Sequence, residues 1–486
     1  MASRKSKKKL KIVDHQKTKI VATIGPASNS VETLVELVRS GVNVFRLNFS
    51  HGSHDDHAQT IQKILDINEK YGIHVGILAD LQGPKLRVGT IEDNKLELAK
   101  NDVITFVNKK CIGTMEQIYM SYKDLASDVE LGERVLIDDG KLVLEVVETD
   151  KKSTVKLKVL HGGVLSSNKG VNLPDTKIKL PALTPKDIRD LNFILEHPVN
   201  WIALSFVRHG KDVQQLQRRI KAKDHLAKVI SKIEKPEALE NIKDIINLSD
   251  AIMIARGDLG VEVPIERLPN IQKDIIRKCI QKAKPVIVAT QMMESMINNP
   301  SPTRAEVTDV ANAVLDGTDA VMLSGETAMG KHPVIVVEAM NKIIHHAEQN
   351  YEIHEKRSKP NPKSDTYFSD TICIHAAKVA EEVNAEAIIG VTVSGYTAFK
   401  VSSYRPFNNI YIFSHVKQML ATMNLVRGVK CFYYDKFTST DETIEDFISI
   451  LKNKSLLKKG DVIVNTAAMP IHKRFRTNMM KLTIVE

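Results

Sequence analysis

The chain has 486 residues, 43% hydrophobic and 26% charged, a composition typical of a soluble globular protein with several domains. No apolar run approaches the roughly 20 residues of a membrane span, and no apolar segment follows the basic N-terminus as in a signal peptide. The four cysteines are widely spaced and form no Cys-x-x-Cys pair. This spacing predicts reduced thiols and a cytoplasmic location, and it argues against a disulfide framework or a zinc site.

The net charge of +10 is concentrated at the N-terminus, where the first 19 residues hold eight Lys or Arg and one acidic residue. We interpret residues 1–15 as a basic, solubilising tail, and contact with nucleic acid or anionic lipid is the alternative. The remaining chain is close to neutral and has no basic stripe interleaved with aromatic residues. We therefore expect neither nucleic acid nor a membrane as a partner.

Apolar runs that end in polar or Gly residues recur eight times before residue 330, and segments of helical periodicity separate most of them. The runs are Lys19–Gly25, Val42–Asn48, His74–Asp80, Trp201–Phe206, Val229–Glu234, Ala251–Asp258, Pro285–Gln291 and Ala320–Glu326. Eight strands alternating with helices predict an α/β fold, a (β/α)8 TIM barrel with its active site at the carboxyl ends of the strands. An open doubly wound sheet is the alternative, but eight regular units without a Gly-x-Gly-x-x-Gly turn favour a closed barrel.

The connection between Asp80 and Trp201 is about 120 residues long, far more than a helix with short loops requires. From Gly89 it contains short alternating runs and turn signals such as Asp138-Asp139-Gly140, which predict an inserted all-β lid domain. A polar linker follows Glu348, and a second α/β pattern lies beyond it. We therefore predict a barrel formed by residues 16–83 and 181–350, a lid at 84–180, and a C-terminal α/β regulatory domain at 365–486.

Two of the predicted strands end in charged residues, the first in Lys232 and Glu234 and the second in Asp258. Because the two strands belong to one strand–helix–strand unit, all three side chains should lie at the same edge of a parallel sheet. Two carboxylates and an ammonium group there suit a divalent cation and a phosphorylated ligand. A structural ion pair is the alternative explanation of an isolated Lys-x-Glu.

Other strand ends add polar side chains to the same predicted rim. They are Arg46, Asn48, Ser50, His51, Asp80, Lys85, Arg87, Arg256, Thr290, Gln291, Ser324 and Glu326. Several cations in one cleft require an anionic ligand. A metal site with fixed cations, and without a Ser-His-Asp or Cys-His pair, favours phosphoryl transfer. The sequence has no Gly-x-x-x-x-Gly-Lys-[Ser/Thr] loop, which argues against a P-loop enzyme.

Six motifs, taken in order, resemble those of the pyruvate kinase family, and the match covers nearly the whole chain. They are Ala22–Ser28, Asn43–Gly52, Ser231–Glu234, Ala255–Gly260, Ala289–Met296 and Met322–Thr327. The resemblance implies transfer of the phosphoryl group of phosphoenolpyruvate to ADP, giving pyruvate and ATP in the last step of glycolysis. It also implies Mg²⁺ or Mn²⁺ as cofactor and an allosteric homotetramer.

The same resemblance, carried over motif by motif, implies a function for individual residues. The implied catalytic residues are Lys232, Arg46, Thr290, Ser324 and Glu326, and those that bind phosphoenolpyruvate are Arg46, Lys232, Gly257, Asp258 and Thr290. Mg²⁺ would be bound by Glu234 and Asp258. The nucleotide would be bound by Asn48, His51, Arg87 and Lys169.

Two other functions are consistent with a metal-binding barrel. The first is an aldolase or lyase that handles enolates, against which the nucleotide-contacting lid strand with Lys169 argues. The second is a catalytically silent metabolite-binding protein. Such a protein would be expected to have lost one of the four central site residues, yet all of them are present: Lys232, Glu234, Asp258 and Thr290.

A monovalent-cation site is implied by the resemblance at Asn48, Ser50, Asp80 and Leu81. The stretch Leu81-Gln82-Gly83-Pro84-Lys85, however, resembles the branch of the family that does not require K⁺. We predict that the Lys85 ammonium supplies the missing positive charge, since a charge inverted at short range is a large local change. The alternative is a solvated lysine at the lid hinge.

A possible effector site follows the first strand of the C-terminal domain, in the segment Thr392-Val393-Ser394-Gly395-Tyr396-Thr397. Hydroxyl groups and a glycine at a helix N-terminus can bind an anion through backbone N–H groups. The segment resembles the loop that binds an effector phosphate in the family, which implies that Thr392, Ser394, Gly395 and Thr397 bind a phosphorylated effector. A plain helix cap is the alternative.

Overall fold

The computed structural model describes residues 10, 12–13, 16–349, 359–436, 439–469 and 476–486. The predicted N-terminal tail, residues 1–15, lies outside this description except for three positions. None of the described helices is both long enough and apolar enough to cross a membrane.

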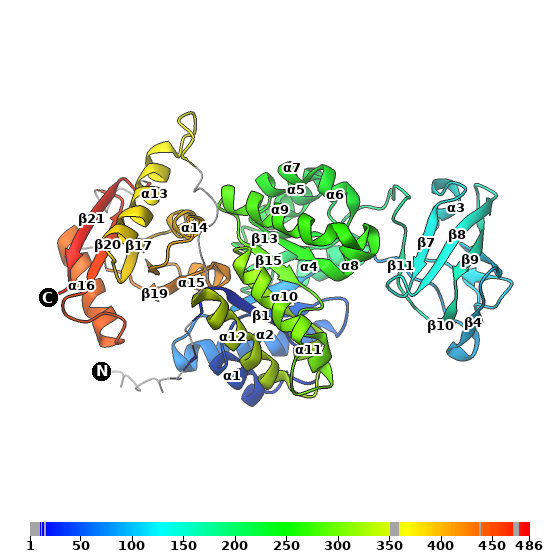
Figure 1. Ribbon diagram of the computed structural model, residues 1–486, viewed down its shortest axis with the longest axis horizontal. Coiled ribbons are helices and arrows are strands. Elements are labelled where there is room, and N and C mark those ends of the chain that lie inside the picture. The colour runs from blue at the N-terminus through cyan, green and yellow to red at the C-terminus, as the bar shows by residue number, and fades with distance from the viewer. Residues whose placement is uncertain (1–9, 11, 14–15, 350–358, 437–438, 470–475) are drawn as a thin grey trace.

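Eight parallel strands close into a barrel at the centre of the molecule (Figure 1). They are β1 (Lys19–Thr23), β2 (Val42–Asn48), β3 (Gly76–Asp80), β12 (Trp201–Leu204), β13 (Lys228–Ile233), β14 (Ala251–Ala255), β15 (Val286–Ala289) and β16 (Ala320–Leu323). Their order around the barrel is β1-β16-β15-β14-β13-β12-β3-β2, so the predicted TIM barrel is confirmed. Most strands end before the predicted run does, because the terminal polar residues already form loops or helices.

Helices surround the barrel and pack their apolar faces against the outer side of its strands. They are α1 (Val31–Arg39), α2 (His54–Tyr71), α4 (Pro185–Ile194), α5 (Gly210–Ala222), α6 (Pro236–Glu240), α7 (Ile242–Leu248), α8 (Arg256–Glu262), α9 (Leu268–Gln281), α10 (Arg304–Leu315), α11 (Gly325–Ala328) and α12 (Pro333–Gln349). Several begin at side-chain caps, among them Ser30, Ser53, Thr184 and Thr303. Each cap satisfies a backbone N–H that has no partner within its helix, and so fixes where the helix starts.

An all-β domain is inserted between β3 and α4, as the sequence predicts. It contains a six-stranded sheet in the order β11-β7-β8-β9-β5-β6 and a two-stranded sheet, β10-β4. The strands are β4 (Leu96–Leu98), β5 (Val103–Val107), β6 (Ile118–Tyr119), β7 (Arg134–Ile137), β8 (Leu142–Thr149), β9 (Thr154–His161), β10 (Gly163–Leu165) and β11 (Val171–Asn172), with the short helix α3 (Leu125–Asp128). The predicted turn joins β7 to β8, with positive φ at Asp138, Asp139 and Gly140. The domain has its own hydrophobic core.

The C-terminal domain is a five-stranded sheet flanked by helices, and it lies on the opposite side of the barrel from the lid (Figure 1). Its elements are α13 (Tyr367–Glu382), β17 (Ala387–Val391), α14 (Tyr396–Ser403), β18 (Asn409–Ser414), α15 (Lys417–Thr422), β19 (Val429–Tyr433), α16 (Thr440–Asn453), β20 (Val462–Ala467) and β21 (Met479–Ile484). The sequence predicted β17, β18 and β20. It did not predict β19 or the antiparallel edge strand β21, which are more exposed and therefore lack a continuous apolar run.

Candidate active site

Four charged side chains meet inside the carboxyl end of the barrel. Lys232 Nζ lies 2.9 Å from Glu234 Oε1 and 3.4 Å from Asp80 Oδ1. Arg46 Nε donates a hydrogen bond of 2.7 Å to the other Asp80 oxygen, Oδ2. The four residues belong to β2, β3 and the end of β13, so the structure brings together the strand ends that the sequence singled out.

Burial and mutual attraction set the protonation of this cluster. Burial alone would raise the pKa of Asp80, but the charges of Lys232 and Arg46 hold it below the usual value. Burial alone would lower the pKa of Lys232, yet the charges of Asp80 and Glu234 raise it. The pKa of Glu234 is raised by burial and by the nearby Asp258 carboxylate, although Lys232 opposes the shift.

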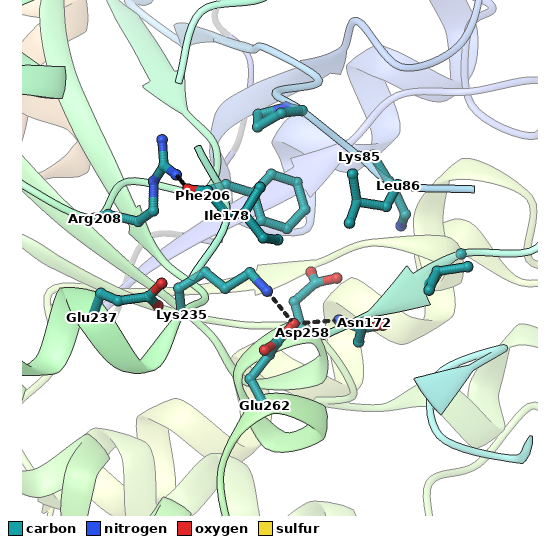
Figure 2. Close-up of a pocket in the computed structure, with 13 residues that line it drawn as sticks. Lys85, Leu86, Asn172, Ile178, Phe206, Arg208, Lys235, Glu237, Asp258 and Glu262 are labelled. Atoms are coloured by element: carbon teal, nitrogen blue, oxygen red, sulfur yellow. Dashed lines mark hydrogen bonds and ion pairs between the residues drawn. The ribbon is translucent and has the colours of Figure 1, made fainter. Parts of the chain in front are cut away.

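A divalent cation fits the two carboxylates of Glu234 and Asp258. Glu234 Oε2 accepts a hydrogen bond of 2.6 Å from the Phe206 backbone N–H, which fixes the carboxylate. Asp258 lies in the first turn of α8 and lines a pocket between lid and barrel (Figure 2). Within the described residues no group of three or more His, Cys, Asp or Glu forms a closed metal site. Two protein carboxylates suit Mg²⁺, because the ion keeps positions for water and substrate oxygens.

Thr290 and Gly257 are held together by a strained loop. The Gly257 backbone N–H donates to Thr290 Oγ1 at 2.7 Å, and a Cβ on Gly257 would lie 3.3 Å from that oxygen. Thr290 and Gln291, just after β15, have φ values of 69° and 52°. Left-handed backbone at residues other than glycine is costly and concentrates at functional sites. In this conformation the Thr290 hydroxyl lies against the start of α8, at Gly257.

Glu326 is buried beside the end of β16. Its Oε2 accepts a hydrogen bond of 2.7 Å from the Ser324 backbone N–H, and its Oε1 accepts one of 3.1 Å from the Met293 N–H. Burial raises the pKa of Glu326 despite these hydrogen bonds. A carboxyl group that keeps its proton to a higher pH is suited to proton transfer.

Residues expected to face the nucleotide lie around this cluster or in the lid. Asn48 Oδ1 accepts a hydrogen bond of 3.1 Å from the Ser50 N–H, and His51 is exposed at the start of the next loop. In the lid, Arg87 Nη1 donates to Asn168 O at 2.8 Å, and Lys169 Nζ lies 2.9 Å from Asp138 Oδ1. These two cations are therefore bonded within the lid and are not part of the charged cluster.

Lys85 lies on the lid side of the pocket that also contains Asp258 (Figure 2). Within the described residues no ion pair joins Lys85 to Asp80; Arg46 and Lys232 are the cations that act on that carboxylate. Leu81 is held by its backbone, since its N–H donates to Ala203 O at 3.1 Å and its carbonyl accepts from Ser205 Oγ at 2.7 Å.

Some residues at the site were not singled out from the sequence. Ser205 Oγ accepts a hydrogen bond of 2.8 Å from Lys232 Nζ, and Thr23 Oγ1 accepts one of 3.0 Å from Arg46 Nη1. Thr23 is the last residue of β1 and Ser205 directly follows β12, so applying the strand-end rule to every strand would have found them. Arg256, by contrast, turns away from the pocket and pairs with Asp309 of α10 at 2.6 Å.

Two family models match the chain. The barrel domain of pyruvate kinase matches residues 15–337, and the α/β domain of pyruvate kinase matches residues 370–483. The chain belongs to the pyruvate kinase family. The architecture of TIM barrel, inserted β domain and C-terminal α/β sheet is that of the family, and the chain is a pyruvate kinase, a glycolytic enzyme that forms pyruvate and ATP from phosphoenolpyruvate and ADP. Enzymes of this family use a divalent metal.

Individual relatives are similar over most of their length. The chain is 42% identical over 472 residues to a pyruvate kinase of Geobacillus stearothermophilus, covering 97% of this chain and 80% of that protein. It is 41% identical over 472 residues to one of Staphylococcus haemolyticus, with the same coverage. A crystal structure of a pyruvate kinase from Cryptosporidium parvum superposes with a TM-score of 0.91 at 37% identity, covering 97% of each chain.

Proposed function

We propose that the cluster around Lys232 is where the phosphoryl group passes from phosphoenolpyruvate to ADP. One observation carries this proposal: the two cations Lys232 and Arg46 meet the carboxylates of Asp80 and Glu234 at one end of the barrel. Lys232 and Arg46 stabilise the charge of the transferring group, which phosphoryl transfer needs more than a nucleophile. Mg²⁺ or Mn²⁺, held by Glu234 and Asp258, neutralises phosphoryl oxygens when bound.

We infer that phosphoenolpyruvate binds beside the start of α8. The Gly257 backbone, Asp258 and Thr290 form this part of the site, and Arg46 and Lys232 bind its phosphoryl group. The left-handed backbone conformation of Thr290 supports the assignment, because it accompanies a hydrogen bond of 2.7 Å from the Gly257 N–H to the Thr290 hydroxyl oxygen. Glu326, with Ser324, relays the proton that converts the enolate to pyruvate, which is consistent with the raised pKa of Glu326.

The nucleotide is proposed to lie between barrel and lid, in contact with Asn48, His51, Arg87 and Lys169. Arg87 and Lys169 are close to the lid strand β11, and their present partners are oxygen atoms of Asn168 and Asp138. Nucleotide phosphates would offer the same kind of acceptor with more negative charge, so they would replace those partners.

The enzyme is proposed to work without K⁺. Asn48, Ser50, Asp80 and Leu81 correspond to the monovalent-cation site of K⁺-dependent relatives. Here the Asp80 carboxylate is already balanced by Arg46 and Lys232. Lys85 supplies a further ammonium in the pocket that Asp258 lines. With these charges in place, a bound monovalent cation adds little.

The loop at Thr392, Ser394, Gly395 and Thr397 is proposed to bind a phosphorylated effector in a cytoplasmic homotetramer. The loop joins β17 to α14, and Gly395 has φ of 85° at the helix N-cap. Its N–H donates to Thr392 Oγ1 at 2.9 Å. A phosphate would bind the remaining backbone N–H groups at the start of α14, since the N-terminus of a helix favours anions.

A coupled assay tests the function directly. Purified enzyme with phosphoenolpyruvate, ADP and Mg²⁺ should release pyruvate and ATP in equal amounts, and chelation of the metal should stop both. Candidate sugar phosphates and nucleotides added to the same assay would identify the effector. Failure to form pyruvate with the metal present would overturn the proposal.

A further inference from the structure

Two donor side chains from separate segments meet on one carboxylate oxygen of Glu262 at the edge of the pocket (Figure 2). Asn172 Nδ2 donates to Glu262 Oε1 at 2.7 Å, and Lys235 Nζ donates to the same oxygen at 2.6 Å. Asn172 ends the lid strand β11, and Glu262 ends the barrel helix α8. Among the described residues, this bond ties the sheet of the lid to the barrel, and Arg208 of the barrel also donates to the Ile178 and Leu180 carbonyl oxygens at the base of the lid.

The two barrel residues of this contact are attached to the proposed cation ligands. Lys235 directly follows Glu234 in the chain, and Glu262 lies four residues after Asp258 on α8. Residues four apart lie on the same face of a helix, so Glu262 and Asp258 move together. The Lys235–Glu262 ion pair therefore ties the segment that carries Glu234 to the helix that carries Asp258.

Burial makes this pair sensitive to the loss of any partner. Lys235 and Glu262 are 7% and 4% exposed. A buried charge that loses its partner is strongly unfavourable, and hydrogen bonds to a charged acceptor are stronger than neutral ones. Lys235 also neutralises Glu262, which would otherwise place another negative charge on the pocket that Asp258 lines.

We propose that Asn172, Glu262 and Lys235 form a latch that couples closure of the lid to the geometry of the cation site. The Lys235–Glu262 ion pair holds the segments that carry Glu234 and Asp258 at a fixed spacing. Asn172 binds the lid to this ion pair through Glu262. The proposal rests on the function proposed above for Glu234 and Asp258. The three residues are positioning residues, since they act through the lid and the cation ligands.

The lid half of the latch is tested by Asn172→Ala, with Asn108→Ala as control, because the Asn108 side chain donates to Lys152 O within the lid. Hydrogen exchange at residues 171–173 and 259–263 should become faster in Asn172→Ala alone. The KM for ADP should rise about tenfold, the effect of losing one charge-assisted hydrogen bond on closure, while kcat changes less. Unchanged exchange and unchanged KM would overturn the latch.

A double-mutant cycle separates the latch from a general structural effect. The increase in KM caused by Asn172→Ala should disappear in a Glu262→Ala background, whereas Glu262→Gln keeps an acceptor oxygen and should restore most of the wild-type KM. An Asn172→Ala effect of equal size in both backgrounds would contradict the proposed contact.

The barrel half is tested with Mn²⁺ alone. The Lys235→Met/Glu262→Met double variant removes both charges and so leaves the net charge of the pocket unchanged. It should weaken Mn²⁺ binding several-fold, measured by electron paramagnetic resonance of the free ion without substrates, whereas Asn172→Ala should leave Mn²⁺ binding unchanged. Wild-type Mn²⁺ affinity in the folded double variant would overturn this half. The exchange and Mn²⁺ measurements do not depend on turnover, so they judge the latch even if the enzyme forms no pyruvate.

Discussion

Arg405 and Asp319 join the C-terminal domain to the amino end of the barrel through a two-pronged ion pair. Arg405 Nη2 donates to Asp319 Oδ2 at 2.7 Å, and Nη1 donates to Oδ1 at 3.2 Å. Asp319 directly precedes β16, and its Oδ1 also accepts from the Arg427 backbone N–H at 3.2 Å. The opposite end of β16 leads to Ser324 and Glu326. One short strand therefore connects the domain junction to the proposed proton relay.

Removing Arg405 should destabilise the protein strongly. Both side chains are nearly inaccessible, with exposures of 5% and 3%, so Arg405→Ala leaves a buried carboxylate without its counter-charge. The expected loss is about 3–5 kcal/mol. Lys481→Ala is the control, because its pair with Asp441 is exposed and such pairs contribute about 0–1 kcal/mol. Urea unfolding measures the loss of stability in both variants. Equal losses would show that the buried ion pair contributes no more to stability than the exposed pair.

Replacing Lys232 by Met should lower kcat by orders of magnitude with a smaller change in KM, because the lost charge acts mainly in the transition state. Lys228→Met is the matched control at the other end of β13, where the lysine pairs with Asp250. Steady-state kinetics and circular dichroism of both variants test this. A Lys232→Met enzyme with near-normal kcat would remove Lys232 from the mechanism.

The wild-type enzyme should keep substantial activity in K⁺-free buffer when a tetramethylammonium salt maintains ionic strength. Lys85→Glu should create a K⁺ requirement, because it replaces an ammonium by a carboxylate at the edge of the pocket. The measurement is initial rate against K⁺ concentration for both enzymes. Strong K⁺ activation of the wild type would contradict the prediction.

Thr397→Glu should abolish activation by a phosphorylated effector. Thr397 is buried in the first turn of α14, and its Oγ1 lies 2.7 Å from Thr477 Oγ1. A carboxylate there would repel a phosphate. Thr440→Glu, in the first turn of α16 in the same domain, is the control. If the Thr397 variant is activated as fully as the control, the loop is only a helix cap.

The sequence predicted those parts of the fold that local pattern determines. Strands of a parallel barrel are buried on both faces, so all eight appear as apolar runs, and residues such as Lys232 and Glu234 mark their ends. The pattern cannot show which distant partner a polar residue meets. Nothing near Asn172 in the sequence points to Glu262, 90 residues later, and nothing near Arg256 points to Asp309. Edge strands such as β21 are also missed, since one of their sides has no neighbouring strand.

Lys17 should make stability depend on pH in the alkaline range. Burial and the neighbouring Arg427 charge lower the pKa of Lys17 to about 8, although Glu348 opposes the shift. In the unfolded chain a lysine titrates near 10.5, so between about pH 8 and 10.5 the unfolded state binds more protons than the folded state. The free energy of unfolding of the wild type should therefore rise with pH in this window, relative to Lys17→Met, by at most about 1.4 kcal/mol per pH unit. Urea unfolding of both proteins at several pH values from 7 to 10 measures the difference, and a difference that stays constant would show that the Lys17 pKa is not lowered.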